Sequence, residues 1–232
     1  MFTGKTVAFL RNLKKNNDRA WFHARRADYE LHCRAPMLAI IDRLAHEFTR
    51  FAPDLAADPK ISLFRPWRDT RFSENKAPLK TNIAAVFPNR ALGRMNGAAL
   101  YFEVATTYVW IGGGIYAPDS PQLQAIREQI AGNQRRFEKL IASPAFRKIG
   151  GLKGDTISRV PRGWPKDHPA ARYLVHKQFL GFREEPAAFA ARPDFYKQLV
   201  TTFKALAPLV SFLNEPLLAR LAVNNRAHLL DE

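Results

Sequence analysis

The sequence predicts a single α+β domain, in which helices pack against a mixed, mainly antiparallel sheet. Over residues 19–51, apolar residues recur every three or four positions, the spacing of a helix face. Over residues 98–105 they alternate every second position, the spacing of a strand. Helical patterns at both ends of the 232-residue chain enclose the strand patterns with no repeat or linker between them. One sheet covered by helices is the economical arrangement.

The N-terminal part is predicted to be helical. Thr3 is suited to cap a first helix, and the Asn-Asn-Asp stretch at residues 16–18 ends it and caps the next. The second helix is predicted over residues 19–51. We expect a kink or a break at Pro36, because proline has no N–H to donate within a helix.

Strands are predicted in the middle of the chain as a mostly antiparallel meander. They are expected at residues 60–67, 81–87, 98–105 and 108–111, with further strands at 156–160 and 173–182.

Later helices are marked by capping residues followed by proline, at Ser120-Pro121 and Ser143-Pro144. A last long helix is predicted over residues 194–213, continued in a short piece at 216–221. We interpret residues 1–232 as one domain with a short tail after about residue 222.

Charge is the feature that departs most from an average protein. The chain has 36 Lys and Arg against 21 Asp and Glu, a formal net charge of +15. Such a field favours anionic partners, namely nucleic acid, phosphorylated small molecules or an acidic membrane surface. The alternative is a basic proteome or a contribution to solubility alone.

Cys33 is the single cysteine, so neither a disulfide within the chain nor a multi-cysteine zinc site is possible. Its place on a helical apolar stripe favours a core residue over a nucleophile. The N-terminus lacks the pattern of a signal peptide, and no membrane span is predicted. We expect a cytoplasmic protein without membrane association.

The densest polar stretch is residues 68–82, a loop between two predicted strands. Arg68, Arg71, Lys76 and Lys80 supply cations suited to phosphate or carboxylate, and Asp69 is placed to orient one guanidinium. Loops of this length are often functional. The alternative is a salt-bridge network that only holds the loop.

Two further segments are candidates for the site. Three glycines at residues 112–114 permit close approach of a ligand or of another strand, and Tyr116 follows them. In the rigid cationic loop 161–169, Arg162 is a ligand-binding candidate, and His168 beside Asp167 is the candidate for proton transfer. A tight turn and a helix cap formed by Asp167 are the respective alternatives.

Several signatures are absent from the sequence, among them those of zinc peptidases, serine hydrolases, P-loop proteins and kinases. Acidic residues are too sparse for a magnesium site of the phosphoryl-transfer type. We predict no metal and no cofactor. A catalytic role is undecided, with His168 and Asp69 as candidates.

The motifs together resemble the DUF2461 family of uncharacterised proteins, over residues 2–213. The resemblance rests on the first-helix pattern Phe9-Leu10-x-x-Leu13-x-x-Asn16-Asn17 with Trp21-Phe22, Arg26 and Tyr29, and on Arg68 to Ser73, Lys76-x-Pro78-x-Lys80, Gly113-Gly114-x-Tyr116-x-Pro118, Pro161-Arg162-Gly163 and Asp167-His168-Pro169. Leu79 stands where an aromatic residue is expected, and Trp164 where phenylalanine is common. The resemblance implies a single α+β cytosolic domain and no known reaction.

Three hypotheses for function follow. The first is a cationic pocket for a phosphorylated or carboxylated small ligand, with catalysis there left undecided. The second is a nucleic-acid-binding module, and the third is a protein-interaction scaffold in which the loops are structural. The sequence does not determine the oligomeric state.

Overall fold

The core of the molecule is a four-stranded antiparallel sheet. The computed structural model describes the backbone of residues 1–230 and the side chains of residues 1–224. The strands are β1 (Ile83–Pro88), β2 (Ala99–Val104), β3 (Tyr108–Ile115) and β4 (Phe179–Pro186), and they lie side by side in this order. Each pairs with the next in antiparallel register. The predicted single α+β domain is confirmed.

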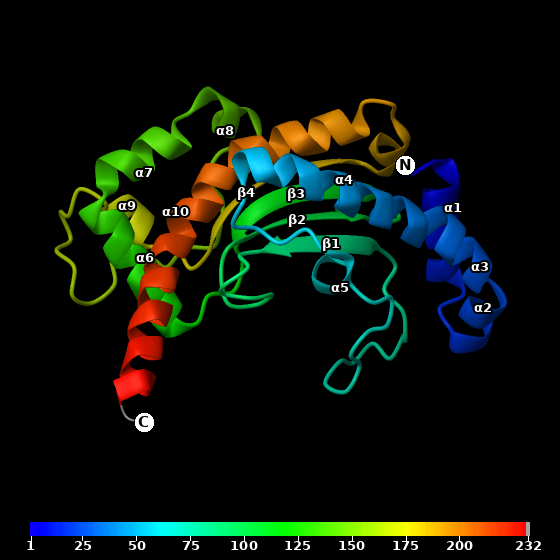
Figure 1. The fold of residues 1–232 in the computed structure, drawn as a ribbon, viewed down its shortest axis with the longest axis horizontal. Helices are drawn as coiled ribbons and strands as arrows, with labels where there is room; N and C mark the ends of the chain where they lie inside the picture. The colour runs from blue at the N-terminus through cyan, green and yellow to red at the C-terminus, as the bar shows by residue number, and fades with distance from the viewer. Residues whose placement is uncertain (231–232) are drawn as a thin grey trace.

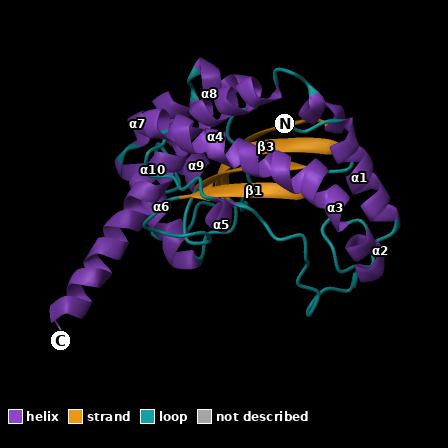
Figure 2. Ribbon diagram, turned by 45° about the vertical axis from the view of Figure 1, so that its right-hand side comes forward, coloured by secondary structure: helices purple, strands orange, loops and turns teal. Residues whose placement is uncertain are grey.

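The helices cover one face of this sheet and both of its ends (Figure 1). We call the face under α4 and α10 the helix face and the opposite face the open face. The N-terminal helices lie at one end, and α6, α7 and α9 lie at the other (Figures 1 and 2). The elements are α1 (Gly4–Lys15), α2 (Arg19–Ala24), α3 (Arg26–Tyr29), the π-helix η1 (Glu30–Arg34), α4 (Ala35–Phe51), α5 (Pro59–Ser62), α6 (Ser120–Gly132), α7 (Gln134–Ile141), α8 (Pro144–Lys148), α9 (Ala171–Leu174), the 3₁₀-helix η2 (Ala187–Ala191) and α10 (Phe195–Leu230).

Phenylalanines join the helix face to both of its covering helices. Phe203 of α10 packs edge-on against Phe87 of β1, with ring centroids 5.6 Å apart. Phe48 of α4 contacts the same Phe87 ring at 5.3 Å, and Phe102 of β2 lies 6.3 Å from Phe203. All four side chains are almost fully buried. Burial of each ring stabilises the fold by roughly 1.5–3 kcal/mol.

The long helix predicted at residues 19–51 is broken into four pieces, as expected for a chain that contains Pro36. A proline at this position cannot donate to the carbonyl of His32, four residues earlier. The hydroxyl of Thr6 in α1 donates to that carbonyl instead, at 2.6 Å. The wide turn η1 precedes the proline, and Cys33 within it is fully buried. Burial raises the pKa of the Cys33 thiol to about 12.

Three predicted strands are wrong in part. Residues 60–62 belong to the short helix α5, because the side chain of Asp58 caps the N-terminus of this helix and Pro59 is its first residue. Only isolated bridges, such as Leu63 to Ala85, follow. Residues 156–160 form a single bridge, from Thr156 to His176. Over 173–182, the helix α9 comes first and β4 starts at Phe179, since a short apolar run does not distinguish helix from strand.

The last helix, α10, is longer than predicted. It continues through Pro208 and Pro216 to Leu230, so residues 216–221 and the expected tail as far as residue 230 are part of one helix. Residues 231–232 of that tail lie outside the described residues. The stretch Phe195–Asn224 is long and apolar enough to cross a membrane by length and composition alone. Within it, Phe203, Leu206 and Leu213 are fully buried against the domain. A helix in the core of a soluble protein can have the same length and composition, so this feature is weak evidence for a membrane span.

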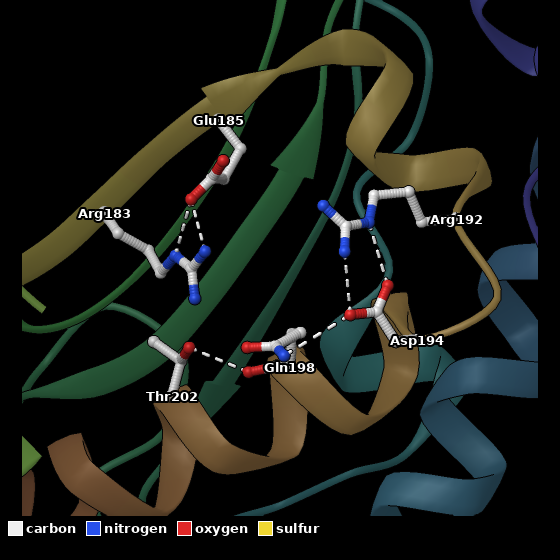
Figure 3. A network of polar contacts seen from close by, with 6 residues as sticks. All are labelled: Arg183, Glu185, Arg192, Asp194, Gln198 and Thr202. Atoms are coloured by element: carbon white, nitrogen blue, oxygen red, sulfur yellow. Dashed lines mark hydrogen bonds and ion pairs between the residues drawn. The ribbon is translucent and has the colours of Figure 1, made fainter.

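Two arginine–carboxylate pairs fix the junction between β4 and α10 (Figure 3). Arg183 pairs with Glu185 on β4, and Arg192 pairs with Asp194 at 2.9 Å just before α10. The two guanidinium groups lie over the same ring, that of Phe189 in η2, at 5.2 and 5.5 Å from its centroid. Each of these arginines thus has both a carboxylate and an aromatic ring of the protein as partners, so we interpret them as structural residues and not as ligand-binding ones.

Candidate functional site

The open face of the sheet carries aromatic side chains in register. Tyr101 of β2 and Phe182 of β4 are the direct neighbours of Gly112 on either side. Trp110, two residues earlier on β3, stacks on Phe182 with centroids 4.8 Å apart and meets Tyr101 edge-on at 5.6 Å. We call Tyr101, Trp110 and Phe182 the aromatic platform. All three side chains are partly exposed.

Gly112 is what allows Trp110 to lie across the strand. A Cβ at residue 112 would be 2.3 Å from the Trp110 ring and 2.8 Å from Cβ of Phe182. Both distances are far below van der Waals contact, so any side chain here would displace the indole. For the three glycines the sequence left close approach and a tight turn as alternatives. They continue β3 rather than form a turn, and the first of them makes room for the platform.

A cleft of about 1070 Å³ lies over this platform. Its floor comes from the open sides of all four strands, and its rim includes Phe64 after α5, Met95 before β2, Tyr116 after β3 and Lys153 before β4. Phe64 continues the aromatic surface, 6.1 Å from Tyr101. An apolar cleft with a few polar groups, at the upper end of the usual size range, is typical of a small-molecule site.

Glu103 is the polar centre of the cleft floor. Its Oε2 accepts from the Tyr101 hydroxyl at 2.9 Å and from the side-chain amide of Asn82, and its Oε1 accepts from the Tyr108 hydroxyl at 2.9 Å. Burial and then the Glu103 charge raise the pKa of Tyr101 above its usual range. Burial, then the hydrogen bond to Glu103 and its charge, raise the pKa of Tyr108 to about 12. Both hydroxyls therefore remain protonated donors to the carboxylate.

Three cations lie close together beside Phe64, and we call Arg65, Lys80 and Arg94 the cation cluster. Arg94 lines the cleft, as Phe64 does, and the charges of Arg65 and Arg94 both act on Lys80. The Arg94 guanidinium lies 4.0 Å from the centroid of the Phe64 ring, and the Lys80 ammonium lies 4.7 Å from it. Burial first, then the charges of Arg94 and Arg65, lower the pKa of Lys80, while Glu103 opposes this effect.

The positive charges of the cation cluster are not neutralised by ion pairs within the described part of the protein. Among the described residues, none of its members forms a salt bridge, whereas Arg71, Arg136, Arg172, Arg183 and Arg192 all do. The Nε of Arg94 is buried and has no hydrogen-bond partner in the described part of the chain. The site therefore holds an excess of positive charge in a partly desolvated place.

The sequence-predicted cations of loop 68–82 divide into two groups. Arg68 donates to the carbonyl of Ala77 at 3.1 Å, and Lys76 donates to that of Thr70 at 3.1 Å. Arg71 pairs with Asp69 at 2.8 Å, and its hydrogen bond lowers the pKa of Asp69. These contacts hold the loop itself.

Lys80 lies at the base of the same loop. It does not line the cleft itself, but its ammonium lies over the ring of Phe64, which does, so it is the residue of this set that belongs to the cation cluster. Tyr116 lines the cleft as a largely exposed side chain on the rim.

The loop 161–169 is not brought to the cleft. Arg162 is exposed, and His168 accepts from the backbone N–H of Ala170 at 3.0 Å and packs edge-on against Trp164. In Figure 1 this loop lies beside α9 at the far left, while loop 68–82 lies at the lower right. The two cationic loops are thus at opposite ends of the domain.

Sequence reasoning did not select the platform, Glu103 or Arg94. A signal was present, since Tyr101 and Glu103 alternate with core residues in β2, and Tyr108, Trp110 and Gly112 do so in β3. Large aromatic residues on the solvent side of a sheet are typical of a surface that binds a ligand or another macromolecule. In the described residues, no group of three or more His, Cys, Asp and Glu side chains lies close enough to hold a metal.

A family model described as conserved hypothetical protein (DUF2461) matches residues 5–212 of this chain. No curated protein matches it.

Proposed function

We propose a function on the premise that this chain belongs to the DUF2461 family, whose description as conserved hypothetical proteins assigns no activity. The cleft on the open face binds a small ligand that carries a phosphate or carboxylate group. The anionic group lies against the cation cluster, and the rest of the ligand lies on the aromatic platform.

The observation that supports this proposal is the cation cluster itself. Two cationic groups share one aromatic ring, within 4.0 and 4.7 Å of its centroid, and a third raises the local positive charge further. Like charges held together and partly desolvated destabilise a fold unless an anion joins them. A phosphate or carboxylate would accept from the buried Nε of Arg94, which is a charge-assisted hydrogen bond.

The acidic residues of the cleft favour a small ligand over a polyanion. Glu103, Glu184 and Asp155 all line it. A nucleic-acid strand laid along the platform would bring a row of phosphates past these carboxylates, at a cost in Coulomb energy. A small molecule with a single anionic end avoids them.

The test is a thermal-shift and calorimetric screen of phosphate esters and carboxylates with matched variants. Lys80→Ala and Arg71→Ala remove the same charge, but only Lys80 belongs to the cation cluster, over the Phe64 ring that lines the cleft. A ligand at 100 times its Kd stabilises the parent by about 2.7 kcal/mol. We expect Lys80→Ala to abolish this shift and Arg71→Ala to keep it. Equal loss in both variants, or no shift with any small anion, would refute the proposal.

A nucleic-acid-binding role is the second candidate, because the net charge is +15 and the open face of the sheet carries aromatic rings. It predicts oligonucleotide binding whose affinity falls steeply with salt, since each phosphate contact releases counterions. Flat affinity between low and physiological salt would exclude it. In either role we propose a cytoplasmic location, where the Cys33 thiol stays reduced.

A further inference from the structure

Residue 110 lies between two carboxylate-bearing residues in one row across the open face. Glu103 of β2 and Glu184 of β4 are its direct partners in the antiparallel register. Neighbouring strands lie about 4.8 Å apart, so the backbones of the two glutamates are roughly 10 Å apart. The indole leans from this row toward Gly112, and both glutamates line the cleft. A ring that stacks on Trp110 therefore lies beside this row, with one carboxylate on the strand at either side.

The two carboxylates have acceptor capacity left for a ligand. A carboxylate has about four lone-pair positions, and Glu103 uses three of them, for Tyr101, Tyr108 and Asn82. Glu184 is exposed and forms no hydrogen bond or ion pair with the described residues. Ionised carboxylates only accept, so the ligand must supply donors on both sides of its ring.

Hydroxyl groups fit this requirement better than the other common donors do. An amine would be attracted by the two carboxylates, but it would add a further cation near the cation cluster of a chain whose net charge is already +15. A ring without donors would cover Glu184 and leave its charge desolvated and unpaired, which is costly. A hydroxyl is neutral and gives a charge-assisted hydrogen bond to each carboxylate.

We propose that the ligand of the cleft is a phosphorylated sugar, whose ring stacks on Trp110 with its hydroxyls donating to Glu103 and Glu184. This inference rests on the proposed function, which supplies the site for the phosphate. It adds the chemical class of the ring and assigns Glu184 as a residue that determines specificity.

The experiment compares phosphate esters of equal charge by isothermal titration calorimetry. Glucose 6-phosphate and ribose 5-phosphate carry hydroxylated rings, and phenyl phosphate carries a ring with none. We expect the full-length protein to bind at least one of the sugar phosphates at least tenfold more tightly than phenyl phosphate. Glu184→Gln should reduce this sugar-phosphate affinity about tenfold or more, as loss of a hydrogen bond to a charged group does, and leave phenyl phosphate within about twofold.

Glu74→Gln is the matched control, because it removes the same charge from an exposed position on loop 68–82. It should leave all affinities unchanged. If phenyl phosphate binds as tightly as both sugar phosphates, or Glu184→Gln acts no differently from Glu74→Gln, the sugar assignment is overturned while anion binding stands. If no phosphate ester binds, the proposed function itself fails.

Discussion

Replacing Gly112 with alanine tests whether the platform depends on the missing side chain. The new Cβ would lie 2.3 and 2.4 Å from two ring carbons of Trp110 and 2.8 Å from Cβ of Phe182. The Phe182 Cβ is fixed by the strand backbone and cannot retreat, so the Trp110 ring has to move by more than 1 Å to reach ordinary contact. That shift separates it from the rings it stacks on.

The expected cost combines three effects. Overpacking of this kind destabilises by about 1–3 kcal/mol, and the loss of the stacked pair accounts for about 0.5–1.5 kcal/mol of it. Alanine also reduces the conformational freedom of the unfolded chain, which returns about 0.4–1 kcal/mol. We therefore expect Gly112→Ala to lower the free energy of unfolding by about 1–2 kcal/mol.

Urea unfolding, followed by tryptophan fluorescence, measures this difference, and ligand titration measures the damage to the cleft. Gly132→Ala is the control, because a Cβ at the end of α6 meets nothing within 4 Å; it should be neutral or stabilise by up to about 1 kcal/mol. If Gly112→Ala unfolds at the same urea concentration as the parent and binds the ligand with the same affinity, the position of Trp110 does not depend on the missing side chain at residue 112.

Three other predictions concern Glu103 and Tyr108 of the cleft and the buried Cys33. Glu103→Gln should destabilise by about 2 kcal/mol, because an amide cannot replace a carboxylate that accepts from three donors; an unchanged urea midpoint would contradict this. The pKa of Tyr108 is raised to about 12, so folding favours the protonated phenol, and this contribution is complete below pH 10 and lost between pH 10 and 12. Urea unfolding from pH 9 to 12 should therefore show a steeper loss of stability in the parent than in Tyr108→Phe, and equal slopes would argue against it. The Cys33 thiol, fully buried with a raised pKa, should react with a thiol reagent at pH 8 only in the unfolded protein; rapid labelling of the native protein would show that the site opens.

Local patterns predicted the parts of the fold whose causes are local. β2 was found from the sequence because one of its faces is open, so that apolar and polar residues alternate. β1 is buried on both faces and gives a continuous run, which specifies its type less well. The break near Pro36 follows from proline alone, but the hydrogen bond from Thr6 that supports it crosses 26 residues and has no local signature.

The site was harder to predict because its residues are far apart in the sequence. Strand pairing brings the aromatic platform together, and folding of the loops brings the cation cluster together. Arg68, Arg71 and Lys76 are close in sequence to their own partners, so their density along the chain reflects the stability of a loop. Phe64 and Arg94, in contrast, are thirty residues apart and meet only in the folded domain. The sequence shows where cations are dense. Only the folded structure shows which of them have no carboxylate partner among the described residues.

The position of α10 in the chain has a consequence for synthesis of the protein. The ribosome releases all four strands before it releases the helix that packs on β3, although α4, the other cover, is made early. Phe87 and Phe102 thus wait for Phe203, about a hundred residues later, before their side of the sheet is closed. The domain therefore closes only after α10 has left the ribosome, and until then the nascent sheet exposes part of its apolar helix face.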